Sequence, residues 1–143
     1  MRTVLVATDG SPHSDRAVDC AADLARASDA SLVVFHVTEA PSGQAAQKLK
    51  EIEHVGEGDI PELLAHSLLA QACSRARAFG AIRISAVATT GDPAEEILSA
   101  AKRKSADMIV VGKRGRGRLA GLLLGSVSHK LVSLAACNVL VVA

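Results

Sequence analysis

The sequence predicts an α/β protein built on an open, doubly wound parallel sheet with helices on both faces. Apolar, β-branched runs alternate along the chain with helix-length segments, and several of these runs are nearly continuous in their apolar residues. A strand that is apolar throughout is typical of a parallel sheet covered by helices on both faces. Strict alternation of strands and helices is the pattern of a doubly wound sheet with right-handed crossovers.

Each element is expected from a local pattern. The strands are the apolar runs Thr3–Ala7, Ser31–Val37, Ile82–Ala88, Met108–Gly112 and Val139–Val142. Helices are expected to open at Ser11-Pro12, at Pro61, at Asp92-Pro93 and at or just before Ser126. Proline is favoured in the first turn of a helix because its missing N–H has no partner there. In the second helix, an i, i+4, i+8 spacing predicts a buried face made of Leu64, Leu68 and Ala72.

Length and composition bound the organisation of the protein. The chain has 143 residues, of which 49% are hydrophobic, so we expect one folded domain over residues 1–143 rather than a disordered chain. The segment Glu39–Asp59 contains prolines and glycines and has little periodicity. It is longer than ordinary connections, which leaves two interpretations: a lid over the site, or a variable surface insertion.

Charge and residue types exclude several classes of function. Sixteen Lys and Arg against 15 Asp and Glu give a net charge of +1, and Phe35 and Phe79 are the only aromatic residues. Nucleic-acid binding is therefore not expected. Cys20, Cys73 and Cys137 lack metal-site spacing and are expected to be reduced thiols. We find no signal peptide and no apolar run long enough to span a membrane, so a cytoplasmic protein without membrane association is expected.

The strongest functional signal follows the fourth predicted strand. Gly112, Gly115, Gly125 and Ser126 form the pattern G-x-x-G, nine residues, G-S, and a helix follows. Glycines let backbone N–H groups approach a phosphate, and a helix N-terminus supplies further donors. A Walker A loop is excluded because Arg118 follows the second glycine, Gly117, where the motif needs lysine. A dinucleotide fingerprint lacks the acidic residue that should end a later strand.

Together with this pattern, segments along the whole chain resemble the universal stress protein family, specifically its ATP-binding branch. These segments are V-L-V-A-T-D-G-S, F-H-V, G-D-P-A-E-E-I, D-M-I-V-V-G-K-R-G-R-G, G-L-L-L-G-S-V-S and the final V-L-V-V. The resemblance implies a five-stranded parallel sheet in the order 3-2-1-4-5, ATP as the ligand, and a homodimer. One departure is Asn138, which stands where the family often has proline.

The resemblance also implies a set of nucleotide-binding residues. They are Ala7, Thr8 and Asp9 at the adenosine, Val37 at the adenine, Val111, Gly112 and Gly115 along the ribose and phosphates, and Gly125, Ser126 and Val127 at the phosphates. Arg114 and its basic neighbours could supply charge to the polyphosphate. Mg²⁺ is expected to be carried mainly by the phosphates, with Asp9 as a candidate ligand. Asp9 has a second interpretation, an Asx turn into the first helix.

Three functions follow from these residues. The first is an ATP-binding protein that acts in stress response or signalling through a nucleotide-dependent conformational or partner switch. The second is a slow ATPase on the same site, and the third is an interaction module without a nucleotide. No catalytic residue is predicted, because neither a carboxylate–histidine pair nor a Walker lysine is evident. His36, at a strand end, is expected to pack or to form a hydrogen bond.

The last strand predicts how the chain assembles. Val139–Val142 is apolar, and the expected topology places it at the edge of the sheet. An exposed apolar edge strand has unpaired N–H and C=O groups and needs cover. Pairing with the same strand of a second copy around a two-fold axis would bury both edges, so a homodimer through this strand is expected.

Overall fold

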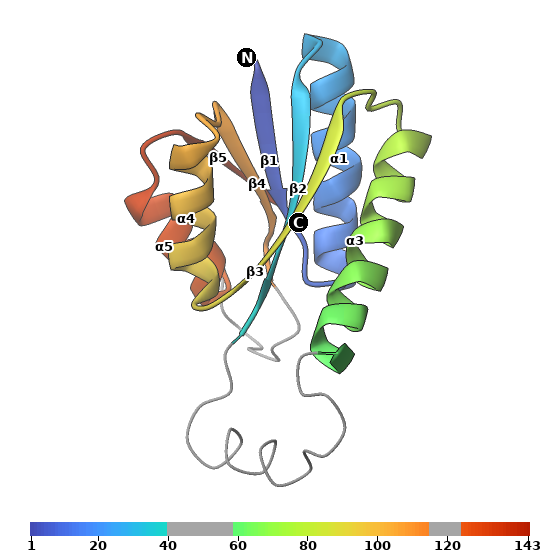
Figure 1. Cartoon of the computed structure of the whole chain (residues 1–143). Coiled ribbons are helices and arrows are strands. Elements are labelled where there is room, and N and C mark those ends of the chain that lie inside the picture. The colour runs from blue at the N-terminus through green and yellow to red at the C-terminus, as the bar shows by residue number, and fades with distance from the viewer. Residues whose placement is uncertain (40–58, 115–123) are drawn as a thin grey trace, which may run out of the picture.

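The computed structural model describes residues 1–39, 59–114 and 124–143. Within these ranges the strands are β1 (Thr3–Ala7), β2 (Ser31–Thr38), β3 (Ile84–Thr90), β4 (Met108–Gly112) and β5 (Asn138–Val142). The helices are α1 (Pro12–Ser28), α3 (Asp59–Ala78), α4 (Pro93–Arg103) and α5 (Ser126–Leu134). All strand pairs are parallel, and the sheet order is β3-β2-β1-β4-β5. The predicted fold class and strand order are confirmed (Figure 1).

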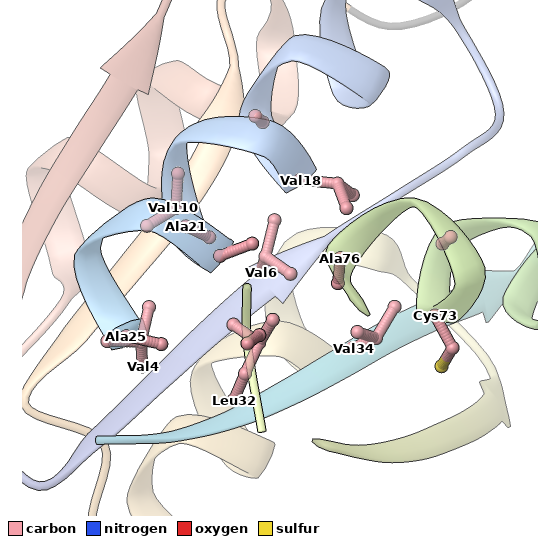
Figure 2. Close-up of a cluster of buried hydrophobic side chains, with 14 of the residues drawn as sticks. Val4, Val6, Val18, Ala21, Ala25, Leu32, Val34, Cys73, Ala76 and Val110 are labelled. Atoms are coloured by element: carbon pink, nitrogen blue, oxygen red, sulfur yellow. The ribbon is translucent and has the colours of Figure 1, made fainter. Parts of the chain in front are cut away.

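The two faces of the sheet carry separate hydrophobic clusters, because side chains alternate between the faces of a strand. Helices α1 and α3 cover one face, while α4 and α5 cover the other (Figure 1). Figure 2 shows the first cluster, in which strand residues such as Val6 and Val34 meet α1 and α3. In the second, Leu5, Phe35 and Ile109 meet α4 and α5. Because the side chains on both faces of the central strands are buried, the sequences of these strands are continuously apolar.

One strand differs from its predicted position. The apolar run Ile82–Ala88 placed the third strand two residues too early, since β3 spans Ile84–Thr90. Ile82 is 83% exposed and lies before the strand. β3 is an edge strand with mostly exposed or half-buried side chains, so hydropathy defines its limits poorly.

Helix α3 also corrects a prediction. It begins at Asp59 rather than Pro61, and of the predicted face of Leu64, Leu68 and Ala72 only Ala72 is buried. Leu64 is 66% exposed, whereas the buried face consists of Ala65, Leu69, Ala72, Cys73 and Ala76. These mostly small side chains let α3 pack closely on the sheet and on α1. Arg75 fixes this packing with a two-pronged ion pair to Asp19 of α1, at 2.5 and 2.8 Å.

The three cysteines are free thiols, as predicted. Burial raises the pKa of the thiol of Cys20, of Cys73 and of Cys137, so each is less reactive than an ordinary exposed cysteine. None of the helices that the structure describes is both long and apolar enough to cross a bilayer. The predicted lid or insertion lies almost entirely at residues 40–58, outside the described ranges.

Candidate functional site

A cavity of about 820 Å³ lies at the carboxyl ends of the central strands. It is bordered by the ends of β1, β2 and β4, by the N-terminus of α5 and by one side of α3. Every predicted site residue within the described ranges lines it: Ala7, Thr8, Asp9, Val37, Val111, Gly112, Arg114, Gly125, Ser126 and Val127. Gly115 lies outside the described residues. The position matches the general rule that doubly wound sheets bind ligands where the strand order reverses.

The turn between β1 and α1 satisfies its own backbone donors. The Asp9 carboxylate Oδ1 accepts the Ser11 N–H at 2.9 Å, which is the Asx turn considered above. The Asp9 N–H donates to Ser14 Oγ at 3.3 Å, and the Gly10 N–H donates to Thr8 Oγ1 at 3.3 Å. Thr8 Oγ1 and Ser14 Oγ, 3.1 Å apart, are themselves hydrogen-bonded. Consecutive N–H groups of this turn are therefore occupied by nearby side chains.

The N-terminus of α1 is closed in the same way. Ser11 is its N-cap, and the Ser11 hydroxyl accepts the Ser14 N–H at 3.2 Å. Asp15 places a carboxylate in the first turn. An acidic residue there offsets the partial positive charge of the helix end. This end of α1 consequently offers little to an anion.

The N-terminus of α5 is different. Its N-cap is Gly125, which makes no side-chain hydrogen bond, and the first turn contains no acidic residue. The first N–H groups of a helix have no partner within the helix, so those of Ser126 and Val127 are donors at the cavity wall. The helix dipole adds partial positive charge at the same point. This end of α5 has the properties of an anion site.

Hydrogen bonds at Lys113 hold this helix end against β4. The Lys113 carbonyl accepts the Gly125 N–H at 2.9 Å and the hydroxyl of the buried Ser128 at 3.0 Å. The Lys113 N–H donates to the carbonyl of Val142, at the end of β5, at 2.7 Å. The position of the α5 N-terminus is thus fixed to the sheet itself.

Two glycines of the predicted motif are present for different reasons. A Cβ on Gly112 would lie 2.8 Å from the backbone carbonyl carbon of His13, which is too close for any real side chain. The packing of α1 against the end of β4 therefore requires glycine at 112. A Cβ on Gly125 would lie 3.5 Å from the Arg114 Cα and the Lys113 carbonyl oxygen, an ordinary contact. The fold alone does not require glycine at 125.

The end of β2 presents a donor and an acceptor to the cavity. The Ser31 N–H donates to the Arg2 carbonyl, and the Phe35 carbonyl accepts the Thr8 N–H at 2.9 Å. The odd-numbered residues of β2 therefore direct their backbone N–H and C=O groups toward β1. Val37 continues this series, but β1 ends at Ala7. Among the described residues, neither Thr8 nor the turn after it bonds the N–H or C=O of Val37. Both groups therefore face the space beyond β1.

Several residues at the cavity were not predicted as site residues. The wall contributed by α3 includes Pro61, Leu64, Leu68 and Gln71. Ser14 and Ser128 also line the cavity and hold its two turns in place. No sequence signal identifies them, because their partners are set by tertiary packing. The signal for α3 was present in Leu64 and Leu68, which are not fully buried and whose apolar side chains line the cavity.

Metal-binding chemistry at the cavity is limited. Within the described part of the chain, no group of three or more His, Cys, Asp or Glu side chains could by itself hold a metal ion. Asp9 and Glu39 are the carboxylates among the described lining residues. One or two carboxylates are typical where Mg²⁺ arrives with a phosphate ligand rather than in an all-protein site.

The fold and the cavity define a doubly wound α/β protein with a cavity at its topological switch point, where proteins of this class bind ligands. The model of the universal stress protein family matches residues 1–143. A universal stress protein of Thermus aquaticus is 39% identical over 99% of this chain and 98% of its own length. Universal stress protein YxiE of Bacillus subtilis is 37% identical over 97% of both chains. The chain belongs to the universal stress protein family.

Solved structures share the fold of this chain. A universal stress protein in complex with cAMP is 36% identical, covers 99% of this chain and 97% of its own, and superposes with a TM-score of 0.76. UspA from Lactobacillus plantarum shares the fold with a TM-score of 0.84 at 24% identity, over 99% and 97% of the two chains. The Archaeoglobus fulgidus protein in complex with dAMP shares the fold with a TM-score of 0.69 at 23% identity, over 100% and 98%.

Proposed function

We propose that this chain binds an adenine nucleotide, ATP in the first place, and acts in stress response through a nucleotide-dependent change in a partner surface. The observation that carries the proposal is the uncapped N-terminus of α5, which opens on a cavity lined by residues from β1, β2 and β4. The 36% identical relative in complex with cAMP supports an adenine nucleotide as the class of ligand.

The base and ribose belong at the strand ends. Ala7, Val37 and Val111 give this part of the cavity an aliphatic wall, which holds a flat base by dispersion. The Val37 N–H and C=O match the acceptor N1 and the donor amino group of adenine. Asp9 lies beside this wall, where its carboxylate can accept from a ribose hydroxyl.

The phosphates belong at α5. The turn after β1 has its N–H groups occupied, whereas Ser126 and Val127 present theirs to the cavity. Glycine at 125 leaves room for a phosphate to approach the backbone, and this explains a glycine that the fold does not require. Arg114, which also lines the cavity, adds positive charge on the same side.

Mg²⁺ would enter with the nucleotide. The carboxylate chemistry of the described residues fits an ion bound mainly by phosphates, with Asp9 as its protein contact. Asp9 Oδ1 already accepts the Ser11 N–H, so this contact would involve the same carboxylate that forms the turn.

We also propose the homodimer through β5. Among the described strands β5 pairs with β4 alone, and its residues Val139–Val142 are half-buried. Such an apolar edge is a template for a second strand. Sedimentation equilibrium should give a dimer for the wild type and a monomer for Val141→Lys, with melting curves to verify folding. A monomeric wild type would contradict the interface, as would an undiminished dimer of a folded variant.

Calorimetry on nucleotide-free protein tests the ligand. ATP with Mg²⁺ should bind at least about tenfold more tightly than GTP, a difference of roughly 1.4 kcal/mol. Titrations with ADP, AMP and cAMP rank the competing adenine ligands. Prolonged incubation with ATP and analysis for ADP measures the slow ATPase that is the alternative on this site. Failure of every adenine nucleotide to bind would contradict the proposal and favour the interaction module.

A further inference from the structure

The side chain of His36 donates a hydrogen bond to the backbone carbonyl of Thr8, beside the proposed base site. His36 Nδ1 lies 2.8 Å from the carbonyl oxygen of Thr8, a residue 28 positions earlier in the chain. A carbonyl oxygen only accepts, so Nδ1 must be the atom that carries the hydrogen. His36 is half-buried and lines the cavity next to Val37.

This hydrogen bond stands where a ladder bond would be expected. In a parallel pair, a residue whose N–H donates to one residue of the neighbour accepts from the N–H two positions further along that neighbour. The Thr8 N–H donates to Phe35, so the Thr8 carbonyl would accept from the Val37 N–H if the ladder continued. The imidazole donor of His36 takes that carbonyl instead.

This replacement of a ladder hydrogen bond by the imidazole bond has a consequence for Val37. The Thr8 carbonyl bonds the imidazole, the β1–β2 pairing ends at Ala7 and Phe35, and the Val37 N–H is left at the cavity wall together with its C=O. In an extended strand these two groups lie on the same side of the chain. They form a donor–acceptor pair that fits the N1 and amino group of adenine and mismatches the N1–H and O6 of guanine.

We propose that His36 is a positioning residue for base specificity: by holding the Thr8 carbonyl, it ends the β1–β2 ladder and keeps the backbone of Val37 open to adenine. This inference rests on the proposed function. It assigns to the imidazole no contact with the nucleotide. Its effect is exerted through the backbone of Thr8 and Val37.

A different role for the same hydrogen bond would be structural only. If His36 did no more than stabilise the turn after β1, its loss would weaken all ligands together and lower the melting temperature. A positioning role predicts a selective effect on the base, and it predicts a change in the protein without any ligand. Both can be measured.

The ligand-free readout is hydrogen exchange at the Val37 amide. In the wild type this N–H should exchange without protection, because none of the residues that the structure describes bonds it. In His36→Ala the ladder bond to Thr8 can form, and protection should increase at least tenfold. In His36→Asn the side-chain Nδ2–H donor is separated from Cα by the same number of bonds as Nδ1 of histidine, so it can still bond the Thr8 carbonyl. The exchange rate of the Val37 amide should then resemble that of the wild type. His36→Gln moves the donor one bond further and is the second disruptive variant if His36→Ala fails to fold.

The ligand readout is the ratio of affinities for ATP and GTP, with ribose 5-phosphate as the base-free control. His36→Ala should lose the preference for ATP by about tenfold while its affinity for ribose 5-phosphate stays unchanged, and His36→Asn should retain the preference. An unprotected Val37 amide and a full ATP preference in a folded His36→Ala would overturn the inference. An equal loss of affinity for ATP, GTP and ribose 5-phosphate in His36→Ala would also overturn it. The same holds if His36→Asn shows the Val37 exchange rate and the ATP preference of His36→Ala. A wild type that binds no adenine nucleotide contradicts the proposed function instead, and the Val37 exchange rates still decide whether His36 controls the ladder.

Discussion

Two helix N-termini that border the cavity, those of α1 and α5, differ in how their backbone donors are used. At α1, Ser11 caps the helix, Asp15 adds negative charge, and the preceding turn bonds its own N–H groups. At α5, Gly125 has no side chain to cap the helix, and the first turn is free of acidic residues. The same kind of element thus supplies a closed wall on one side of the cavity and an anion site on the other.

Helix α4 extends the comparison. Its N-terminal residues Pro93 and Ile97 also line the cavity, but Asp92 caps it by accepting the Glu95 N–H at 3.0 Å. Glu95 and Glu96 place two further carboxylates in its first turn. Of the helices whose N-caps the structure describes, only α5 has neither a capping side chain nor a first-turn acid. The proposed phosphate binding is therefore directed to one end of the cavity.

The largest expected effect comes from making α5 resemble α1. Gly125→Asp places a capping carboxylate at a residue whose φ of −70° and ψ of 168° suit an N-cap. The carboxylate should accept the N–H groups that a phosphate would use and repel the phosphate. ATP affinity should fall at least about a hundredfold, roughly 2.7 kcal/mol, while the melting temperature stays level or rises. Unchanged affinity by calorimetry would contradict the phosphate site.

The next effect separates the two glycines. Gly112→Ala forces a Cβ against the His13 backbone and should lower the free energy of unfolding by about 2 kcal/mol, as overpacked cores do. Gly125→Ala is the matched control, because its Cβ has ordinary contacts, and its stability should change by less than about 0.5 kcal/mol. Urea denaturation measures both. Equal losses would show that the glycines serve the same purpose.

Substitutions of Asp9 should have a smaller effect, part of it on stability and part on nucleotide affinity. Asp9→Ala removes the acceptor of the Ser11 N–H and should cost about 1 kcal/mol of stability together with some nucleotide affinity. Asp9→Asn keeps an oxygen for the turn and removes the charge. Its stability should match the wild type, while its affinity for Mg-ATP falls. If thermal melts and calorimetry show that Asn restores both properties, the carboxylate charge has no role in binding.

The smallest effect lies at the amino ends of β1 and β4, opposite the cavity, and serves as the negative control. Asp107 Oδ2 accepts the N–H groups of Arg2 and Thr3 at 2.7 and 2.9 Å, and these bonds hold the pKa of the Asp107 carboxyl below its usual value. A lowered pKa in the folded state stabilises the protein above about pH 4, and this contribution is lost as the pH falls. Asp107→Asn should therefore flatten the acid limb of the stability profile. Nucleotide affinity at neutral pH should not change; a change would mean that the cavity is not an independent site.

The sequence predicted those features that local chemistry determines. The limits of β1 and β4 are as expected because both strands are buried on both faces. The starts of α1 and α4 are as expected because a capping residue followed by proline identifies a helix N-terminus. The glycine pattern likewise located the α5 end of the cavity without knowledge of any contact.

Features set by packing were not predicted. The buried face of α3 depends on how closely it approaches α1, so small residues such as Ala65 and Ala76 are buried while Leu64 is exposed. His36 was recognised as a strand-end residue that packs or bonds, but its partner, Thr8, is distant in sequence. The pairing of Thr8 with Ser14 is equally invisible in a single sequence. Each of these requires the relative placement of two elements.

The central claim is that the nucleotide phosphates bind at the N-terminus of α5 and not at the turn before α1. The most direct measurement compares backbone amide shifts in nitrogen-15 spectra of the wild type titrated, in the absence of Mg²⁺, with adenosine and with ATP, since their difference isolates the phosphates. The account predicts that this difference is large at Ser126 and Val127 and small at Gly10 and Ser11. A large difference at Gly10 and Ser11 with none at Ser126 and Val127 would contradict it.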